Sequence, residues 1–62
     1  MPIVRIELFS GRTRKQKADT ARGIAEVLER TMSVPVENTQ VIFFDVEKSD
    51  WARAGQLYDE KE

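Results

Sequence analysis

The sequence contains neither cysteine nor histidine. No disulfide can therefore form, and the usual side-chain ligands of zinc and other transition metals are missing. The acidic residues do not follow the spacing of a calcium-binding loop, so no metal or other cofactor is expected. The same absences exclude Ser-His-Asp and Cys-His nucleophilic sites within one chain. The general bases that remain are carboxylates, lysines, Tyr58 and the amino terminus.

Long hydrophobic runs and an excess of charge of one sign are also lacking. No apolar stretch approaches the roughly 20 residues of a membrane helix, and the N-terminus has no signal-peptide pattern. The formal net charge is −1. We therefore expect neither a membrane nor a nucleic-acid partner, and we expect a cytoplasmic protein.

The 62 residues, of which 40% are hydrophobic and 34% charged, predict one small globular domain over residues 1–62. A domain of this length buries only about 60% of the surface that its unfolded chain exposes. Small folds without disulfides or metals usually gain stability by oligomerisation. The composition therefore favours an oligomer.

The first half of the chain predicts a strand and then a helix. Apolar residues alternate with Arg5 and Glu7 over residues 2–9, which is typical of a strand with one buried face. Thr13 and Gln16 fit a capping box, and apolar residues then recur at helical spacing over residues 14–32. Gly23 within this helix would allow close packing on a sheet.

The second half predicts another strand and a short hairpin. Residues 39–46 are nearly continuously apolar and rich in β-branched and aromatic side chains, as in a strand covered on both faces. With one helix in the chain, the second cover must come from another subunit. Residues 51–58 predict a short hairpin or turn. The fold class is therefore α/β, a β-α-β unit with parallel strands, a C-terminal hairpin and an oligomeric assembly.

Several local motifs occur along the chain, namely Met1-Pro2-Ile3-Val4, Gly11-Arg12-Thr13, Gln16-Lys17, Val34-Pro35, Val41-Ile42-Phe43 and the spaced Asp45, Trp51 and Gly55. In these motifs, in length and in element order, nearly the whole chain resembles the 4-oxalocrotonate tautomerase family. The resemblance implies a homo-oligomer, a hexamer built as a trimer of dimers. It also implies an isomerase without a cofactor that acts on a small carboxylate substrate, as in aromatic degradation.

The resemblance assigns catalysis to Pro2 and Arg12. Removal of Met1 exposes the secondary amine of Pro2, which moves a proton between positions of an enol or dienol acid. An α-amino group has a pKa of about 7.7 to 8.0, and an apolar pocket with a neighbouring cation such as Arg12 lowers that pKa further. Arg12 is also expected to bind a substrate carboxylate with two hydrogen bonds.

Three further residues are assigned to substrate binding by the same resemblance. Leu8 matches a position whose backbone contributes to the pocket. Gln40 stands where the family has a second arginine, and Gln cannot balance a second carboxylate, so the family's usual dicarboxylate is expected to be a poor substrate. Trp51 replaces a phenylalanine and keeps an apolar wall. Whether Arg14 or Arg53 compensates for Gln40 is left open.

Two other classes of function remain as alternatives. The first is a water-adding lyase of the same superfamily, such as a haloacrylate dehalogenase, in which Asp45 or Asp50 activates water. The second is a non-catalytic oligomeric module in which Pro2 simply starts a strand, as proline often does.

Overall fold

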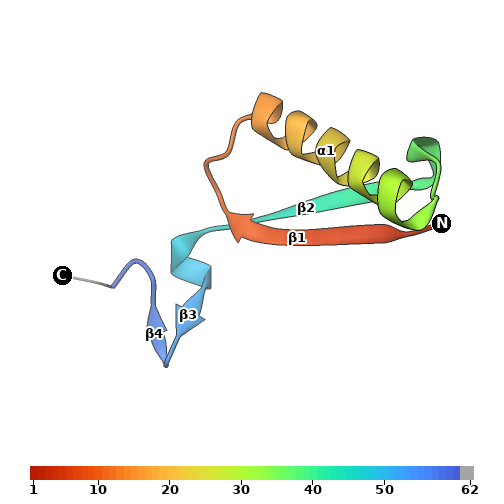
Figure 1. Cartoon of the computed structure of the whole chain (residues 1–62). Helices are drawn as coiled ribbons and strands as arrows, with labels where there is room; N and C mark the ends of the chain where they lie inside the picture. The colour runs from red at the N-terminus through yellow and green to blue at the C-terminus, as the bar shows by residue number, and fades with distance from the viewer. Residues whose placement is uncertain (61–62) are drawn as a thin grey trace.

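The computed structural model describes residues 1–60 and shows one helix beside two long strands, with a small hairpin toward the C-terminal end (Figure 1). In chain order the elements are β1 (Ile3–Phe9), α1 (Arg14–Met32), a 3-10 turn (Val36–Asn38), β2 (Gln40–Val46), a second 3-10 turn (Lys48–Asp50), β3 (Ala52–Arg53) and β4 (Gln56–Leu57). The predicted strand, helix, strand and hairpin are all present.

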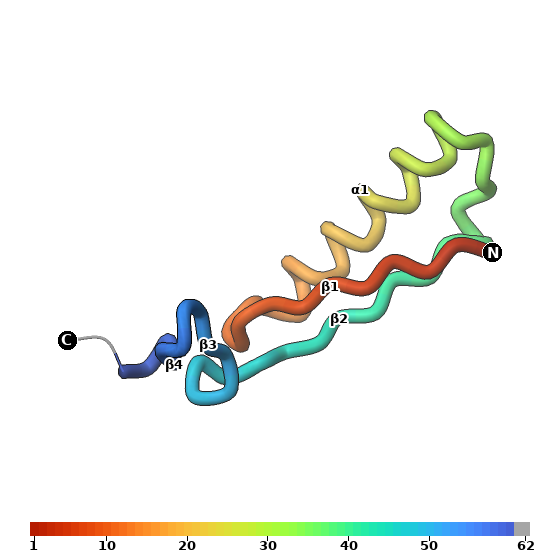
Figure 2. Tube along the Cα trace, turned by 90° about the horizontal axis from the view of Figure 1, so that it is seen from below, coloured from red at the N-terminus to blue at the C-terminus, as the bar shows by residue number. Residues whose placement is uncertain are grey.

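Strands β1 and β2 lie side by side and run parallel, as Figures 1 and 2 both show. Their register pairs Ile3 with Gln40 at one end and Phe9 with Val46 at the other. Helix α1 crosses between them and covers one face of the two-stranded sheet. The predicted α/β class and β-α-β connection are therefore confirmed.

Local hydrogen bonds fix both ends of α1. At the start, the Gln16 backbone N–H donates to Thr13 Oγ1 at 3.0 Å, and the Thr13 N–H donates to Gln16 Oε1 at 2.9 Å. This is the predicted capping box. At the end, Ser33 adopts a left-handed conformation with φ 59°, and its N–H donates to the Glu29 carbonyl. The helix thus spans the residues predicted from the sequence.

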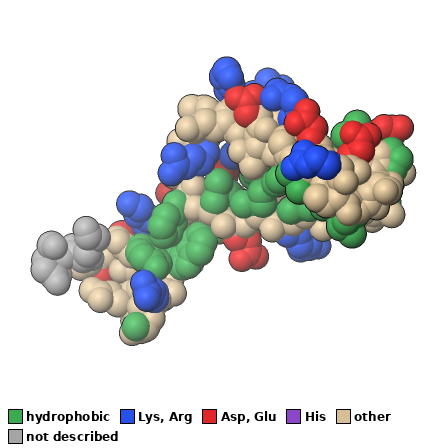
Figure 3. All heavy atoms as spheres, viewed as in Figure 1, with side chains coloured by type: hydrophobic (Ala, Val, Ile, Leu, Met, Phe, Trp, Pro, Cys, Tyr) green, Lys and Arg blue, Asp and Glu red, His purple; other side chains and the backbone are tan. Residues whose placement is uncertain are grey.

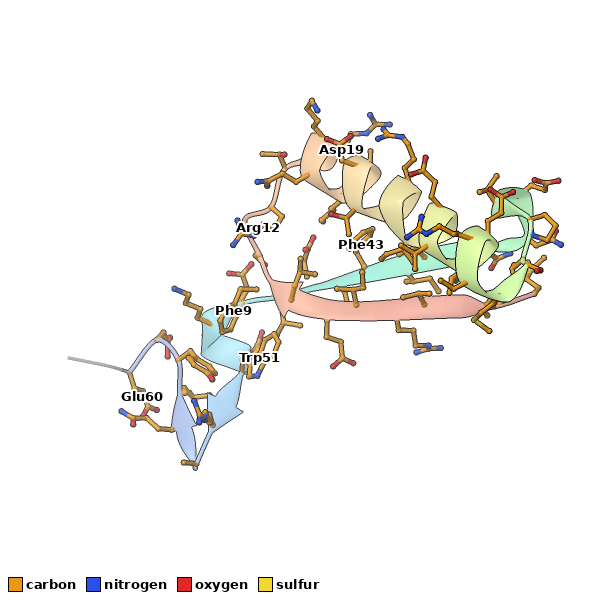
Figure 4. The ribbon with its side chains drawn as sticks, viewed as in Figure 1. Phe9, Arg12, Asp19, Phe43, Trp51 and Glu60 are labelled. Carbon is orange, nitrogen blue, oxygen red and sulfur yellow. The ribbon has the colours of Figure 1, made fainter. Side chains whose placement is uncertain are left out.

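The two faces of the β1–β2 sheet have different surroundings. The face under α1 carries half-buried Val4, Ile6, Leu8, Val41 and Phe43, and Figure 4 shows Phe43 pointing toward the helix. The opposite face carries Ile3, Ile42 and Phe44, which are 55%, 38% and 38% exposed. The sequence predicted that β2 needs cover on both faces, and within one chain only one face has it.

A single copy has no buried core. No residue of the described range 1–60 is fully buried. The radius of gyration is 15.0 Å, against about 11 Å for a compact chain of this length. The accessible surface is 5031 Å², against about 4,100 Å² for a compact monomer of this mass. The elongated shape favours the predicted oligomer, which stays a prediction.

The C-terminal hairpin extends away from the helix and sheet (Figure 2). Its turn places Ala54 and Gly55 at φ 56° and 81°, as in the two-residue turns that match the twist of paired strands. Aromatic rings attach its base to β1, because Phe9 lies 4.6 Å from Trp51 and 4.9 Å from Tyr58 between ring centroids. These rings anchor the hairpin where β1 ends.

Gly23 does not serve the close packing that its position in the helix suggested. A Cβ added to Gly23 would meet no atom within 4 Å. The residue instead lines a shallow apolar concavity on the helix, together with Ile24, Val27 and Leu28. The sequence prediction of a tight helix–sheet approach at Gly23 is therefore wrong within one chain.

Candidate active site

A concavity of about 440 Å³ lies between the start of α1 and the last part of the β1–β2 sheet. Its volume falls within the usual range of ligand sites. Its floor is apolar and its rim is charged and polar, and Figure 3 shows hydrophobic side chains along the sheet with Lys and Arg side chains beside them. The lining residues are Ile6, Leu8, Arg12, Gln16, Lys17, Asp19, Thr20 and Phe43.

Arg12 lies on the loop that joins β1 to α1, at the mouth of this concavity (Figure 4). Gly11 has φ +126°, a conformation that L side chains rarely adopt, so the turn before Arg12 requires glycine. Thr13, the residue after Arg12, caps the start of α1 and so fixes the C-terminal end of this loop. Arg12 is exposed, and its guanidinium is available to an incoming carboxylate.

Lys17 is a second cation in the same concavity, and the sequence did not single it out. Its Nζ donates to Asp45 Oδ2 at 2.6 Å and lies 5.9 Å from the ring centroid of Phe43. Its side chain is 25% exposed. Its position in the helix alone is that of a solvent-facing charge, and its partner Asp45 is 28 positions away in the sequence.

The acidic group on the rim is already paired. Asp19 accepts hydrogen bonds from Lys15 at 2.8 Å and from both terminal nitrogens of Arg22 at 3.0 Å. All three side chains are well exposed, so these pairs contribute little stability. They nevertheless offset the negative charge of Asp19 next to Arg12 and Lys17.

Pro2 and Gln40 lie together at the other end of the sheet. The Gln40 N–H donates to the Pro2 carbonyl at 3.0 Å, and Gln40 Nε2 lies 3.0 Å from Met1 Sδ. The whole length of β1, about 23 Å at ~3.3 Å per residue, separates this end from the loop that carries Arg12. The structure therefore does not bring Pro2 and Arg12 together within one chain.

The remaining site residues, Leu8 and Trp51, lie in different places. Leu8 lines the concavity with Arg12. Trp51 packs on Phe9 beyond the end of the sheet, as Figure 4 shows, and lines a separate hollow with Glu7 and Asp50. Within one chain the predicted residues therefore form two groups, Pro2 with Gln40 and Leu8 with Arg12, while Trp51 stands apart.

The structure also places the residues that the sequence left open. Neither Arg14 nor Arg53 lines the concavity that contains Arg12. Arg53 lies on the hairpin with Gln56, Leu57 and Tyr58. Of the two candidate water-activating carboxylates, Asp45 is held by Lys17, and Asp50 faces the hollow beside Trp51.

Over residues 1–60, no helix combines the length and the apolar character needed to cross a lipid bilayer.

A parallel β-α-β unit with a terminal hairpin, and a concavity with two cations at the start of its helix, define the class of this chain as a small α/β protein. Residues 2–61 match the family described as "Tautomerase enzyme". The chain belongs to this family.

Similar proteins agree with this membership. A probable tautomerase of Streptococcus agalactiae serotype III is 39% identical over 57 residues, which cover 92% of this chain and 95% of the relative. A probable tautomerase of Ralstonia nicotianae is 38% identical over 61 residues, covering 98% and 94%.

Solved structures show the same fold. A 4-oxalocrotonate tautomerase homologue superimposes with a TM-score of 0.90 at 31% identity, covering 100% of this chain and 98% of the other. A heterohexamer 4-oxalocrotonate tautomerase from Chloroflexus aurantiacus superimposes with a TM-score of 0.89 at 27% identity, covering both chains completely. The resemblance read from the sequence is therefore confirmed.

Proposed function

We propose that residues 1–62 act as one tautomerase domain that catalyses keto–enol tautomerisation of a small 2-hydroxydienoate or related enol acid. Membership of the tautomerase family is the observation that supports this class of reaction. The concavity with Arg12 at its mouth and apolar Ile6, Leu8 and Phe43 on its floor fits a short acid with an unsaturated carbon chain.

Pro2 is the proposed general base once Met1 is removed. With Met1 attached, the Pro2 nitrogen is an amide and has no useful basicity. As a free secondary amine it accepts the proton of the 2-hydroxyl group and returns a proton to C3 or C5, while the C2–O bond becomes a carbonyl. Substrate and product contain the same atoms and electrons, so the reaction needs no oxidant or reductant. A base with a pKa near the working pH suits this transfer.

The proposed site forms between copies of the chain. Pro2 and Gln40 lie at one end of β1, and Arg12 lies beyond the other end. Two copies placed side by side with their β1 strands antiparallel would bring Pro2 of one copy next to Leu8 and Arg12 of the other. The relative from Chloroflexus aurantiacus is a heterohexamer, and a homo-oligomer, of which a hexamer is one form, is proposed for this chain.

The first experiment tests the reaction. Intact mass confirms that Met1 is absent, and ultraviolet absorbance follows ketonisation of 2-hydroxymuconate and phenylenolpyruvate. We expect turnover that Pro2→Ala abolishes. Absence of turnover with both compounds by a correctly processed protein would contradict the proposed function.

The second experiment tests whether two copies share one site. Pro2→Ala and Arg12→Gln are each expected to be nearly inactive, and an equimolar mixture is unfolded and refolded together. If Pro2 and Arg12 come from different copies, random mixing gives both functional groups to about a quarter of the sites. The mixture should therefore regain about a quarter of the wild-type activity. Recovery of no activity would refute the shared site.

The hydratase alternative loses support because Asp45 is bound to Lys17 and Asp50 faces a different hollow. Hydration of a haloacrylate that disappears in Asp45→Asn or Asp50→Asn would restore it. The non-catalytic alternative would be favoured if protein purified from its native host retained Met1.

A further inference from the structure

Lys17 differs from every other charged residue that the structure describes. Over residues 1–60 it is the one Lys, Arg, Asp or Glu that is not exposed. A charge between a helix and a sheet loses solvation and persists only when it has partners. Asp45 supplies one partner at 2.6 Å, and the face of Phe43 supplies a second contact at 5.9 Å. Both partners hold the Lys17 ammonium group at the wall of the concavity.

The Lys17 ammonium group can donate more hydrogen bonds than it makes within residues 1–60. An ammonium group has three N–H donors, and Asp45 is its one hydrogen-bonded partner over residues 1–60. Lys17 and Arg12 line the same concavity, whereas the nearby Lys15 does not. The concavity thus offers two cationic groups, and its apolar floor separates them from bulk water on one side. Two cations over an apolar floor match an acid with a carboxylate at each end.

We propose that Lys17 is a specificity-determining residue, whose ammonium group binds the second carboxylate of a dicarboxylate enol acid. Lys17 would then supply the positive charge that Gln40 lacks, in place of Arg14 or Arg53. The inference rests on the proposed function, because it places the substrate in the concavity beside Arg12. It also changes the expectation drawn from Gln40, since a dicarboxylate becomes an acceptable ligand.

The test compares two stable acids with one carbon skeleton, trans,trans-muconate with two carboxylates and sorbate with one. Dissociation constants are measured by titration calorimetry or ligand-observed NMR. Lys17→Met removes the charge and keeps an apolar chain over Phe43, and Lys17→Arg keeps the charge. The matched control is Arg30→Met, which also removes one positive charge from α1, but from an exposed side chain in the last turn of the helix and outside the concavity.

We expect Lys17→Met to weaken muconate binding about tenfold and to change sorbate binding less than twofold, as loss of one charge-assisted hydrogen bond at a partly exposed site would. Lys17→Arg should stay within about threefold of wild type, and Arg30→Met should leave the binding of both acids unchanged. A merely structural Lys17 would give equal effects on both acids. That result, or the absence of muconate binding to wild type at millimolar concentration, would overturn the inference.

The outcomes separate this inference from the proposed function. Binding of muconate that depends on Lys17, without turnover of any enol acid, would contradict the proposed reaction and leave the role of Lys17 intact. Turnover of enol acids with a muconate-to-sorbate preference that Lys17→Met does not change would support the reaction and refute the role of Lys17.

Discussion

A substitution at Phe44 tests whether copies of this chain associate through the open face of the sheet. Its ring lies on the sheet face that α1 does not cover, and it is 38% exposed. An aromatic side chain has about 200 Å² of surface, so about 75 Å² of Phe44 remains in water. At ~25 cal/mol per Å², covering that area by another copy contributes about 2 kcal/mol per chain.

Phe44→Ser removes this contribution from every copy at once. In an interface to which two copies each bring one Phe44, the loss is about 4 kcal/mol, or roughly a thousandfold in the dissociation constant. Sedimentation equilibrium over a range of concentrations measures it directly. Met32→Ser serves as the control, because Met32 is 63% exposed at the end of α1 and lies off the sheet.

The result that would refute this reasoning is a Phe44→Ser protein with the dissociation constant of wild type. A wild-type chain that is monomeric and folded at micromolar concentration would also refute it. An equal effect of Met32→Ser would show that the helix end, and not the sheet face alone, contributes to the interface.

Two further predictions follow from the same structure. Since a single copy has no fully buried residue over 1–60, folding should be linked to assembly, and tenfold dilution should lower the Tm in calorimetry by a few degrees; a Tm independent of concentration would contradict this. Thr13→Ala removes the cap that holds the start of α1, so chemical denaturation should show about 1 kcal/mol less stability per chain. Because Thr13 also borders Arg12, the KM for the enol acid should rise, and Thr13→Ser should restore both values.

Much of the fold could be predicted because its determinants are local in the sequence. Thr13 and Gln16 are three positions apart and form the cap that starts α1, so the helix boundary needs no tertiary information. In β1, apolar residues alternate with charged ones, which indicates a strand with one buried face. In β2, the continuous apolar run indicates a strand that is buried on both faces. The sequence predicts a hairpin or turn over residues 51–58 without its exact form, since the turn depends on the left-handed conformation of Ala54 as well as Gly55.

The site could be predicted only in part, because its contacts join distant segments. The resemblance assigns a role to Arg12, and the structure places this residue at a concavity. The sequence assigns no role to Lys17, since its partner Asp45 is on β2 and its position in the helix alone is that of a surface charge. Gly23 shows the opposite error, in which a local pattern suggested packing that the chain does not make.

The open sheet face and the divided site impose the same requirement on the assembly. An arrangement that covers Phe44 but leaves Pro2 far from every Arg12 would stabilise the fold without giving activity. In the proposed oligomer one arrangement satisfies both requirements, and loss of assembly is expected to remove the proposed activity. Phe44 touches neither end of β1, as it pairs with Glu7, so Phe44→Ser should keep normal turnover at high protein concentration and lose it on dilution in step with dissociation. Turnover per chain that stays constant while the oligomer dissociates would show that one copy contains the whole site.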